Sequence, residues 1–310
     1  MTGKKLFAFA IVMMLGTHGF AEDMTPSKIF EEVETTYESM QTYKAQGTIT
    51  SNIDTGGMKM NIETSFSILL KKPNLYLISW TQKNMPMPGM AQSGAVWSDG
   101  SQPYLYMGVM NAYSKMSSDE LAFAGATGIS GGAAFTIPSL FLSAFKECPT
   151  LFSRLKDPKI EKMEKIGEED CYVISGASTI SKKETFWISK STHLILKHLR
   201  SLEPHEGGMA MPELTDQELE EAIKGMGQEV TIENKQRIRE TMNRSRDVRK
   251  TTKMKGSSTE VHVDISSPDM SKKDFRFAVP EGTVLKESLF GGVLGGSGEI
   301  SNKSMNPNKR

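Results

Sequence analysis

The sequence has only two cysteines, Cys148 and Cys171, among 310 residues, and it carries no excess charge, with 37 acidic and 37 basic side chains. Two cysteines cannot form the framework of a small disulfide-rich protein. A balanced charge argues against nucleic acid as a partner, because proteins that bind it usually carry a basic excess. Both classes are therefore disfavoured from composition alone.

Beyond the N-terminus, no apolar run is long enough for a transmembrane segment, which needs about 20 apolar residues. The N-terminus has two lysines, then the apolar residues 6–15, then small residues that end at Ala21. This order is typical of a secretory signal peptide. We expect residues 1–21 to be removed on export. An oxidising compartment then allows a disulfide between Cys148 and Cys171, with two buried free thiols as the alternative.

The sequence also lacks a complete catalytic or metal-binding motif. Residues 128–132 match G-x-S-x-G, but a nucleophile elbow needs a strand before it, and residues 122–126 are not strand-like. The histidines form no H-E-x-x-H pattern, and no glycine motif for phosphates or dinucleotides occurs. We therefore expect no enzymatic activity, no cofactor and no dedicated metal site.

Methionine, by contrast, is abundant, with 21 residues. Three Met-x-Met units fall in predicted loops, beginning at Met58, Met85 and Met209. Thioether sulfur suits Cu(I), so a methionine-rich copper-binding protein is one alternative. Methionine also adapts to varied apolar shapes on permissive binding surfaces, and this interpretation is favoured.

Alternation of polar and apolar residues dominates the chain and predicts antiparallel strands. An opening helix is predicted over 25–43, with Thr25 as its cap and Pro26 in its first turn. The predicted strands cover 44–53, 60–70, 75–82, 94–98, 103–109, 171–178, 183–189, 193–202, 258–265 and 274–279.

Two of these strands have informative faces. Residues 75–82 are apolar on both sides, so both faces should be covered. In 258–265 the apolar residues Val261 and Val263 alternate with Glu260 and His262, which predicts one apolar and one polar face.

Residues 117–156 are rich in bulky apolar side chains but are interrupted by glycines. Ser118 can cap a short helix, residues 125–134 are predicted to be flexible, and Pro138 opens a second helix. Such a segment is typical of a lid that packs on a binding surface and can move. Together with the surplus of apolar strand faces, it predicts a concave apolar surface that suits a long acyl chain.

A charged segment interrupts the strands near the C-terminus. Residues 213–233 hold seven acids and one base, and residues 234–255 hold nine bases and two acids. We expect two helices of opposite charge that pair with each other. The alternative is a basic arm for an anionic lipid, a nucleic acid or a protein partner.

Several short motifs, taken in order, resemble the periplasmic lipoprotein-carrier (LolA-like) family over roughly residues 25–285, except most of 205–255. They are LKKPNLY at 70–76 running into Trp80, VWSDG at 96–100, YLY at 104–106, FWI at 186–188 and FRFAVPEGTV at 275–284. The resemblance implies an α+β protein with an unclosed, curved antiparallel β-barrel covered by helices. It also implies a periplasmic location, a lid over Ala133–Phe145 and an apolar cavity for acyl chains.

The candidate lipid site has two sides and one lid contact. Lys72 stands where carriers of this family have an arginine that hydrogen-bonds to the lid, so the resemblance makes Lys72 the lid contact. The sheet side comprises Phe66, Ile68, Leu70, Leu77 and Trp80, and the lid side comprises Phe135, Leu140, Phe141 and Phe145.

The sequence therefore predicts a signal peptide over 1–21, a single carrier-like domain over 22–288 with a charged helical insertion at 205–255, and a disordered tail over 289–310. The predicted function is non-enzymatic binding or carriage of lipid or lipoprotein acyl chains. An envelope sensor or partner-binding protein on the same fold remains an alternative, as does copper binding.

Overall fold

The computed structural model describes residues 24–289, except 56–57, 84–91, 147–149, 179–180, 204–215, 217–218, 221–222, 224–228, 252–253 and 288. Its strands are β1 (Thr42–Thr55), β2 (Met58–Lys71), β3 (Leu75–Lys83), β4 (Gln92–Asp99), β5 (Pro103–Met107), β6 (Ala112–Lys115), β7 (Lys156–Ile166), β8 (Glu169–Ala177), β9 (Glu184–Ser189), β10 (Ile195–Ser201), β11 (Met254–Ser266) and β12 (Val284–Lys286). Its α-helices are α1 (Pro26–Ser39), α2 (Asp119–Ile129), α3 (Pro138–Phe141) and α5 (Ile232–Thr251).

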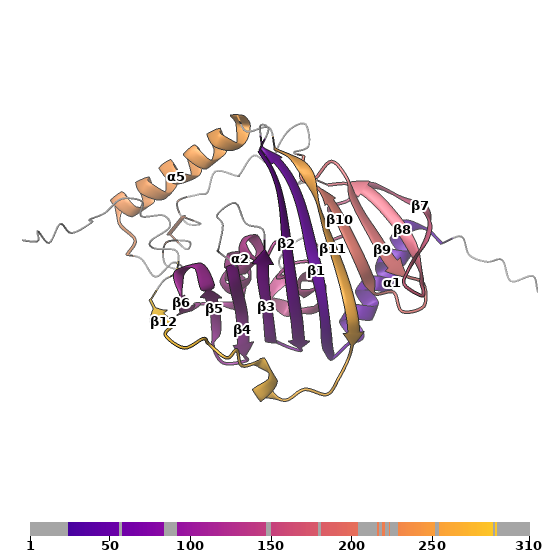
Figure 1. Cartoon of the computed structure of the whole chain (residues 1–310), viewed down its shortest axis with the longest axis horizontal. Helices are drawn as coiled ribbons and strands as arrows, with labels where there is room; N and C mark the ends of the chain where they lie inside the picture. The colour runs from indigo at the N-terminus through magenta and orange to yellow at the C-terminus, as the bar shows by residue number, and fades with distance from the viewer. Residues whose placement is uncertain are drawn as a thin grey trace, which may run out of the picture.

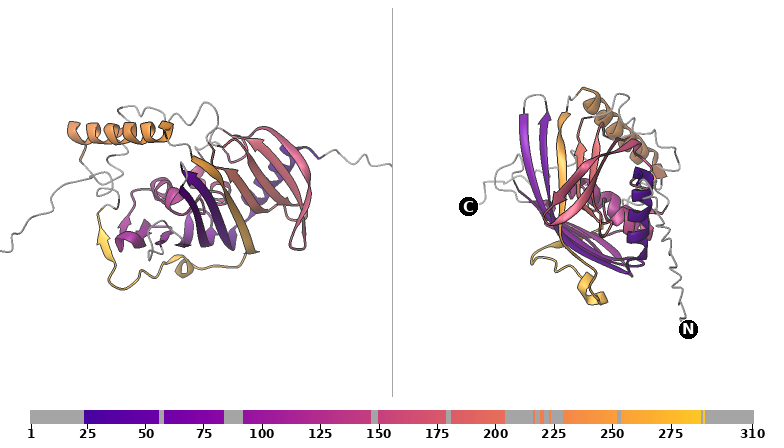
Figure 2. Two further views of the ribbon diagram at one scale, coloured as in Figure 1. Left: turned by 45° about the horizontal axis from the view of Figure 1, so that its top comes forward. Right: turned by 90° about the vertical axis from the view of Figure 1, so that its right-hand side faces the viewer.

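All these strands form one sheet in the order β12-β6-β5-β4-β3-β2-β1-β11-β10-β9-β8-β7 (Figure 1). The strand pairs are antiparallel except β12 with β6, which is parallel. Figure 2 shows the sheet curving around α1 and α2, with the chain after β11 passing on the outside. The predicted fold class, an open curved sheet covered by helices, is confirmed, with one parallel pair at its edge.

Helix α1 begins as the sequence predicts but ends earlier. The Thr25 hydroxyl accepts a hydrogen bond from the Lys28 backbone N–H at 3.3 Å, and Pro26 occupies the first turn. The helix stops at Ser39 rather than at residue 43, because the period-two pattern of β1 takes over at Thr42. One face of α1 is buried against the sheet through Ile29, Phe30, Val33 and Tyr37.

Strand β3 is covered on both faces, as its apolar pattern predicts. Its concave side belongs to the main core, and its convex side packs on Met270 and Phe275. Phe277 extends this cover, with its ring 5.2 Å from that of Trp97. The predicted strand over 274–279 is therefore wrong. Its apolar side chains cover the outside of the sheet, and its backbone forms a 3₁₀ turn at Lys272–Phe275 and then an extended strap.

Strand β7 is absent from the predicted strands. It is rich in exposed lysine and glutamate side chains and lies at the edge of the sheet, where it pairs only with β8. Charged side chains are a common way to protect an edge strand. The same charged side chains also remove the alternation of polar and apolar residues by which a strand is recognised in a sequence.

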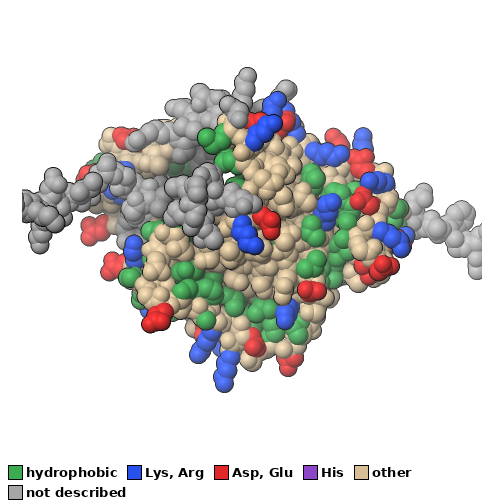
Figure 3. Space-filling model, viewed as in Figure 1, with side chains coloured by type: hydrophobic (Ala, Val, Ile, Leu, Met, Phe, Trp, Pro, Cys, Tyr) green, Lys and Arg blue, Asp and Glu red, His purple; other side chains and the backbone are tan. Residues whose placement is uncertain are grey.

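The charged insertion forms its own small cluster at one end of the sheet (Figure 1). Arg239 and Lys235 of α5 pair with Asp216 and Glu220, and Ile238 packs with the apolar side chains of Leu219 and Ile223. The predicted pairing of opposite charges is confirmed for these residues. On the face shown in Figure 3, acidic and basic side chains are likewise interspersed rather than segregated.

Several predicted features lie outside the described residues, namely the signal peptide 1–21, residues 290–310 of the predicted tail 289–310, and the methionine units at 85–90 and 209–211. Leu289, the first residue of that tail, is instead buried in the main core. Within the described part, no helix combines the length and hydropathy needed to cross a membrane.

Cys148 also lies outside the described residues, whereas Cys171 is a buried free thiol on β8. Cys171 packs with Val173 and Trp187 in a cluster separate from the main core. Because Cys148 lies outside the described residues, the disulfide with Cys171 stays a prediction.

Candidate functional site

The predicted lid lies between α2 and the segment that leads to β7. Helix α2 is capped as predicted, because the Ser118 hydroxyl accepts from the Leu121 backbone N–H at 3.3 Å. The predicted flexible run over 125–134 is wrong in its first half, where α2 continues to Ile129. Turns then carry the chain to α3, and Ala133 and Ala134 are fully buried at the start of the lid.

The aromatic side chains of the lid pack into the core beneath it. The Phe141 ring lies 6.3 Å from that of Tyr43, and the Phe145 ring lies 5.0 Å from that of Phe123. Phe135 meets Phe145 edge-on at 5.9 Å. Leu140 is partly buried against the same core. The structure thus brings all the predicted lid residues into one cluster.

The predicted sheet side faces the lid except at one position. Phe66, Ile68, Leu70 and Trp80 are buried on the concave face and belong to the same core as the lid. Leu77 pairs with Leu69 and packs in the clusters on the convex face. Its assignment to the site is wrong, because adjacent residues of a strand point to opposite faces.

Lys72 contacts both α1 and the lid. Its Nζ donates to the backbone oxygens of Tyr37, at 3.0 Å, and Glu38 at the end of α1. The same Nζ lies 4.9 Å from the centre of the Phe141 ring. Burial lowers the pKa of Lys72, and the nearby Glu38 carboxylate opposes this shift. Lys72 therefore reaches the lid through an aromatic face rather than through a hydrogen bond.

A cavity of about 560 Å³ opens next to this contact. It brings together Lys72 and the lid residues Leu140, Phe141 and Phe145, with Glu34 and Glu38 of α1 at its rim. An apolar wall with a few charged groups is a common composition of pockets for small molecules.

The concave face also contains four buried ionisable side chains that are not among the predicted site residues. We call Glu184 of β9, His198 of β10, and Glu260 and His262 of β11 the polar strip. Glu260 and His262 are 4% and 3% exposed, whereas Val263 is 49% exposed. The alternation predicts two different faces for this strand but not which face is buried, and the structure buries the face with Glu260 and His262.

Each carboxylate of the polar strip has a histidine neighbour. Glu184 Oε2 lies 3.0 Å from His198 Nε2, and His198 stacks on Phe186 with ring centres 4.3 Å apart. Glu260 Oε2 accepts a hydrogen bond from the Thr136 hydroxyl at 2.6 Å, which ties the lid to β11. Glu260 Oε1 lies 3.0 Å from His262 Nε2, at an angle that does not form a hydrogen bond.

Burial and pairing act in opposite directions on the two carboxylates. Burial raises the pKa of Glu260, but His262, His198 and Thr136 together hold it below its usual value. The pKa of Glu184 is lowered in the same way, against burial, by His198, Ser178 and Arg200. Both groups are therefore carboxylates at neutral pH.

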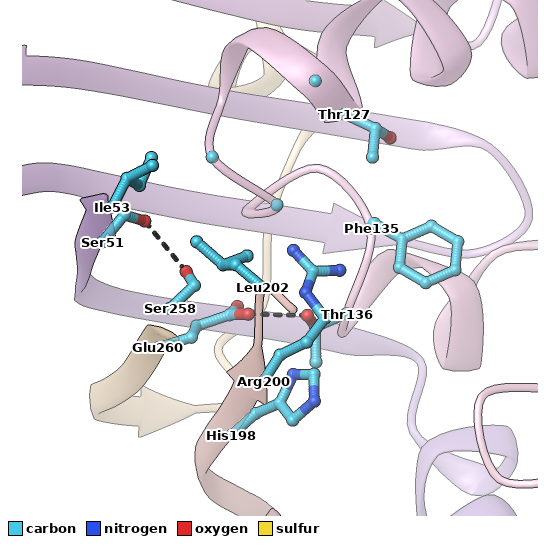
Figure 4. Close-up of a pocket in the computed structure, with 13 residues that line it drawn as sticks. Ser51, Ile53, Thr127, Phe135, Thr136, His198, Arg200, Leu202, Ser258 and Glu260 are labelled. Carbon is cyan, nitrogen blue, oxygen red and sulfur yellow. Dashed lines mark hydrogen bonds between the residues drawn. The ribbon is translucent and has the colours of Figure 1, made fainter. Parts of the chain in front are cut away.

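A second cavity, of about 280 Å³, lies beside the polar strip (Figure 4). Strands β1, β10 and β11 form one side of it, and the turn between α2 and α3 forms the other. Its lining is mixed, with Arg200, His198 and Glu260 together with Ile53 and Phe135. No sequence signal marks this cavity except the glycine run 128–132, whose residues Gly128, Gly131 and Gly132 line it.

The same glycine run fails the test for a serine nucleophile. Ser130 follows helix α2 rather than a strand, and it is fully buried. Its hydroxyl donates to the Thr127 carbonyl at 3.2 Å and accepts from the Ala134 backbone N–H at 3.1 Å. Ser130 therefore stabilises a turn, and a nucleophile elbow requires a different context. Among the described residues, no group of three or more His, Cys, Asp or Glu side chains is placed to hold a metal ion.

No protein-family model matches the sequence, and no curated protein matches it either. Similar solved structures exist at low identity. An uncharacterized conserved protein from Thermus thermophilus is 10% identical, with 84% of this chain and 97% of that chain covered and a TM-score of 0.38. A LolA superfamily protein from Nitrosomonas europaea is 11% identical, with 82% and 98% covered and a TM-score of 0.28.

The MucA/MucB complex from Pseudomonas aeruginosa is also similar, at 14% identity, with 59% of this chain and 52% of that chain covered and a TM-score of 0.29. With TM-scores below 0.5, these similarities do not define a ligand, a partner or an activity for this chain.

Proposed function

We propose that this chain binds, and carries, lipid or lipoprotein acyl chains in the periplasm, beneath the lid 133–145, without catalysing a reaction. One observation carries the proposal. The lid and the sheet share an apolar core, yet the described backbone hydrogen bonds of the lid stay within residues 130–146. The lid can therefore leave the sheet as a unit without breaking a strand ladder.

The lid is attached to the sheet through side chains. Its polar attachments to β11 and to the turn after β2 are Thr136 to Glu260, at 2.6 Å, and Ser143 to the Pro73 carbonyl, at 3.5 Å. Apart from Lys72, which lies over the Phe141 ring, the lid is held by apolar packing that includes Phe135, Phe141 and Phe145. An acyl chain can replace that packing, since each buried CH₂ contributes about 0.8 kcal/mol.

Binding of a fluorescent fatty acid to Phe145→Glu tests this proposal. Phe145 lines the cavity of about 560 Å³ and contacts Phe123 and Phe135. It is preferable to Phe141, where an introduced carboxylate could pair with Lys72. When the lid is open, a carboxylate at position 145 can reach water. When the lid closes over an acyl chain, the same carboxylate would be buried against the chain, so it opposes binding. We expect binding at least tenfold weaker, about 1.4 kcal/mol, with a circular dichroism spectrum like that of the wild type.

Val263→Glu is the matched control, because Val263 is an exposed apolar residue on the other face of the sheet. It should bind as the wild type does. Unchanged binding by a folded Phe145→Glu variant would show that the lid does not line the site. A wild-type protein that binds no fatty acid of any length would overturn the proposed function itself.

A further inference from the structure

Arg200 is the cationic group of the cavity beside the polar strip. It lies on β10, half-buried, between its cross-strand neighbours Glu184 of β9 and Ser258 of β11. In Figure 4 its guanidinium stands within the ring of lining residues, near Leu202 and Thr136. A guanidinium that is partly withdrawn from water requires hydrogen-bond acceptors.

The two buried carboxylates near Arg200 are already engaged elsewhere. Glu184 accepts from the Ser178 hydroxyl through Oε1 and faces His198 through Oε2. Glu260 accepts from Thr136 through Oε2 and faces His262 through Oε1. The charge of Arg200 helps to lower the pKa of Glu184, but among the described residues no hydrogen bond or ion pair to the guanidinium is present. Its five N–H donors are therefore available to a ligand.

The turn above Arg200 leaves room for such a ligand. Gly131 and Gly132 have φ values of 70° and 115°, a conformation that favours glycine. A Cβ at Gly132 would lie 3.9 Å from Nη2 of Arg200, and a Cβ at Gly128 would meet nothing within 4 Å. On the sheet side, the hydroxyls of Ser51 and Ser258 lie 3.0 Å apart and add a neutral hydrogen-bonding pair.

Beside the polar side chains of Thr127, Thr136, His198 and Glu260, the cavity lining includes apolar side chains on the side of the lid. Ile53, Phe135 and Leu202 line the cavity together with Arg200. Phe135 also meets Phe145, which lines the larger cavity. One wall thus offers a cation, and the adjoining wall continues into the aromatic cluster beneath the lid.

We infer that Arg200 binds the anionic head group, a carboxylate or a phosphate, of an amphiphile whose acyl chain lies beneath the lid. The planar guanidinium suits both anions, because it can donate two parallel hydrogen bonds to a pair of oxygens. This inference rests on the proposed function and adds the head-group class of the ligand.

Calorimetric titration with three ligands of equal chain length tests the inference. The ligands are dodecanoate, dodecyl phosphate and neutral dodecanol, each below its aggregation limit. In Arg200→Gln we expect dodecanoate and dodecyl phosphate to bind at least tenfold more weakly, and dodecanol to change less than twofold. Arg200→Lys keeps the charge without the planar fork and should weaken both anions by a smaller factor.

Lys197→Gln is the matched control, since it removes one positive charge from the same strand on the opposite face, where Lys197 covers Trp187 at 4.2 Å. It should leave all three affinities unchanged. If both Arg200 variants weaken all three ligands equally, or weaken none of them, the head-group assignment is overturned. Binding of dodecanol to the wild type would still support the lid site in that case. Inorganic phosphate that binds as tightly as dodecyl phosphate would show a free-anion site and overturn the link to the acyl chain. If the wild type binds no alkyl ligand, the proposed function fails first.

Discussion

The concave face of the sheet has two halves with opposite chemistry. On β2 and β3 the facing pairs are Phe66 with Trp80 and Ile68 with Ile78, and all four are buried apolar side chains. On β9, β10 and β11 the concave face instead carries the polar strip, which is buried to a similar degree. Burial alone therefore does not decide what a strand presents to the core. Charged groups are accommodated where each finds a partner.

The largest expected effect comes from removing one partner in the polar half. Glu260→Ala leaves His262 buried without its carboxylate and removes the acceptor of Thr136. Breaking a buried pair in this way costs about 3–5 kcal/mol. Urea unfolding at neutral pH measures the loss.

The double variant Glu260→Met, His262→Leu is the control for that experiment. Replacing both partners by apolar groups of similar size leaves no buried polar group without a partner and should recover most of the stability. A double variant as unstable as Glu260→Ala would mean that the polar half stabilises the fold through something other than pairing.

In the apolar half, Ile68→Ala should destabilise the fold by about 2–5 kcal/mol, since it leaves a cavity in a closely packed core. Ile68 is fully buried on the concave face, whereas its counterpart Leu77 is half-buried on the convex face. Leu77→Ala should therefore cost less than half as much in the same unfolding assay. Equal losses would contradict the assignment of the two faces.

The apolar half could be predicted from the sequence because its pattern and its burial agree. The hairpin of β1 and β2, the caps at Thr25 and Ser118, and the cover on both faces of β3 all follow from local rules. Leu77 is assigned to the wrong face because its strand is apolar on both sides, so an error of one residue in the register goes unnoticed.

The burial of the polar half could not be predicted, because the alternation in the sequence does not show which face of a strand is buried. In β11 burial of the apolar face would place Val263 inside, yet Glu260 is buried with Thr136 of the lid and His198 of β10 as its partners. Those partners are distant in sequence. The same holds for the strap over the convex face, where Phe275 and Phe277 look like strand residues but serve as cover.

Acid should affect the polar half selectively. The pKa values of Glu184 and Glu260 are lowered in the folded state, so folding is favoured above the ordinary glutamate pKa of about 4.3. That stability is lost as the pH falls through the lowered values. The free energy of unfolding of the wild type should therefore drop more steeply below pH 4.3 than that of Glu184→Gln, Glu260→Gln. Parallel pH curves for the two proteins would refute this origin of acid sensitivity.

A smaller effect is expected where the polar half holds the lid. Thr136→Val keeps the shape of the side chain but removes the hydroxyl that donates to Glu260. Loss of a hydrogen bond to a charged group costs about 2 kcal/mol. Because the bond joins the lid to β11, we expect faster hydrogen exchange in residues 133–145 and less change in β2 and β3. Ser139→Ala removes only a hydroxyl that bonds within the lid, and it should leave exchange in β11 unchanged.

The smallest effect is expected from deleting the charged insertion, which lies outside both halves. Ser201 at the end of β10 pairs with Ser257 of β11, and the Leu202 backbone N–H donates to the Gly256 carbonyl at 2.9 Å. The two strands are thus already neighbours where the insertion leaves the sheet. Replacing residues 204–252 by a short glycine-containing turn should keep cooperative unfolding and change the free energy of unfolding by about 1 kcal/mol or less. Loss of cooperative unfolding would show that the α5 cluster is part of the core, as a third region beside the apolar and polar halves.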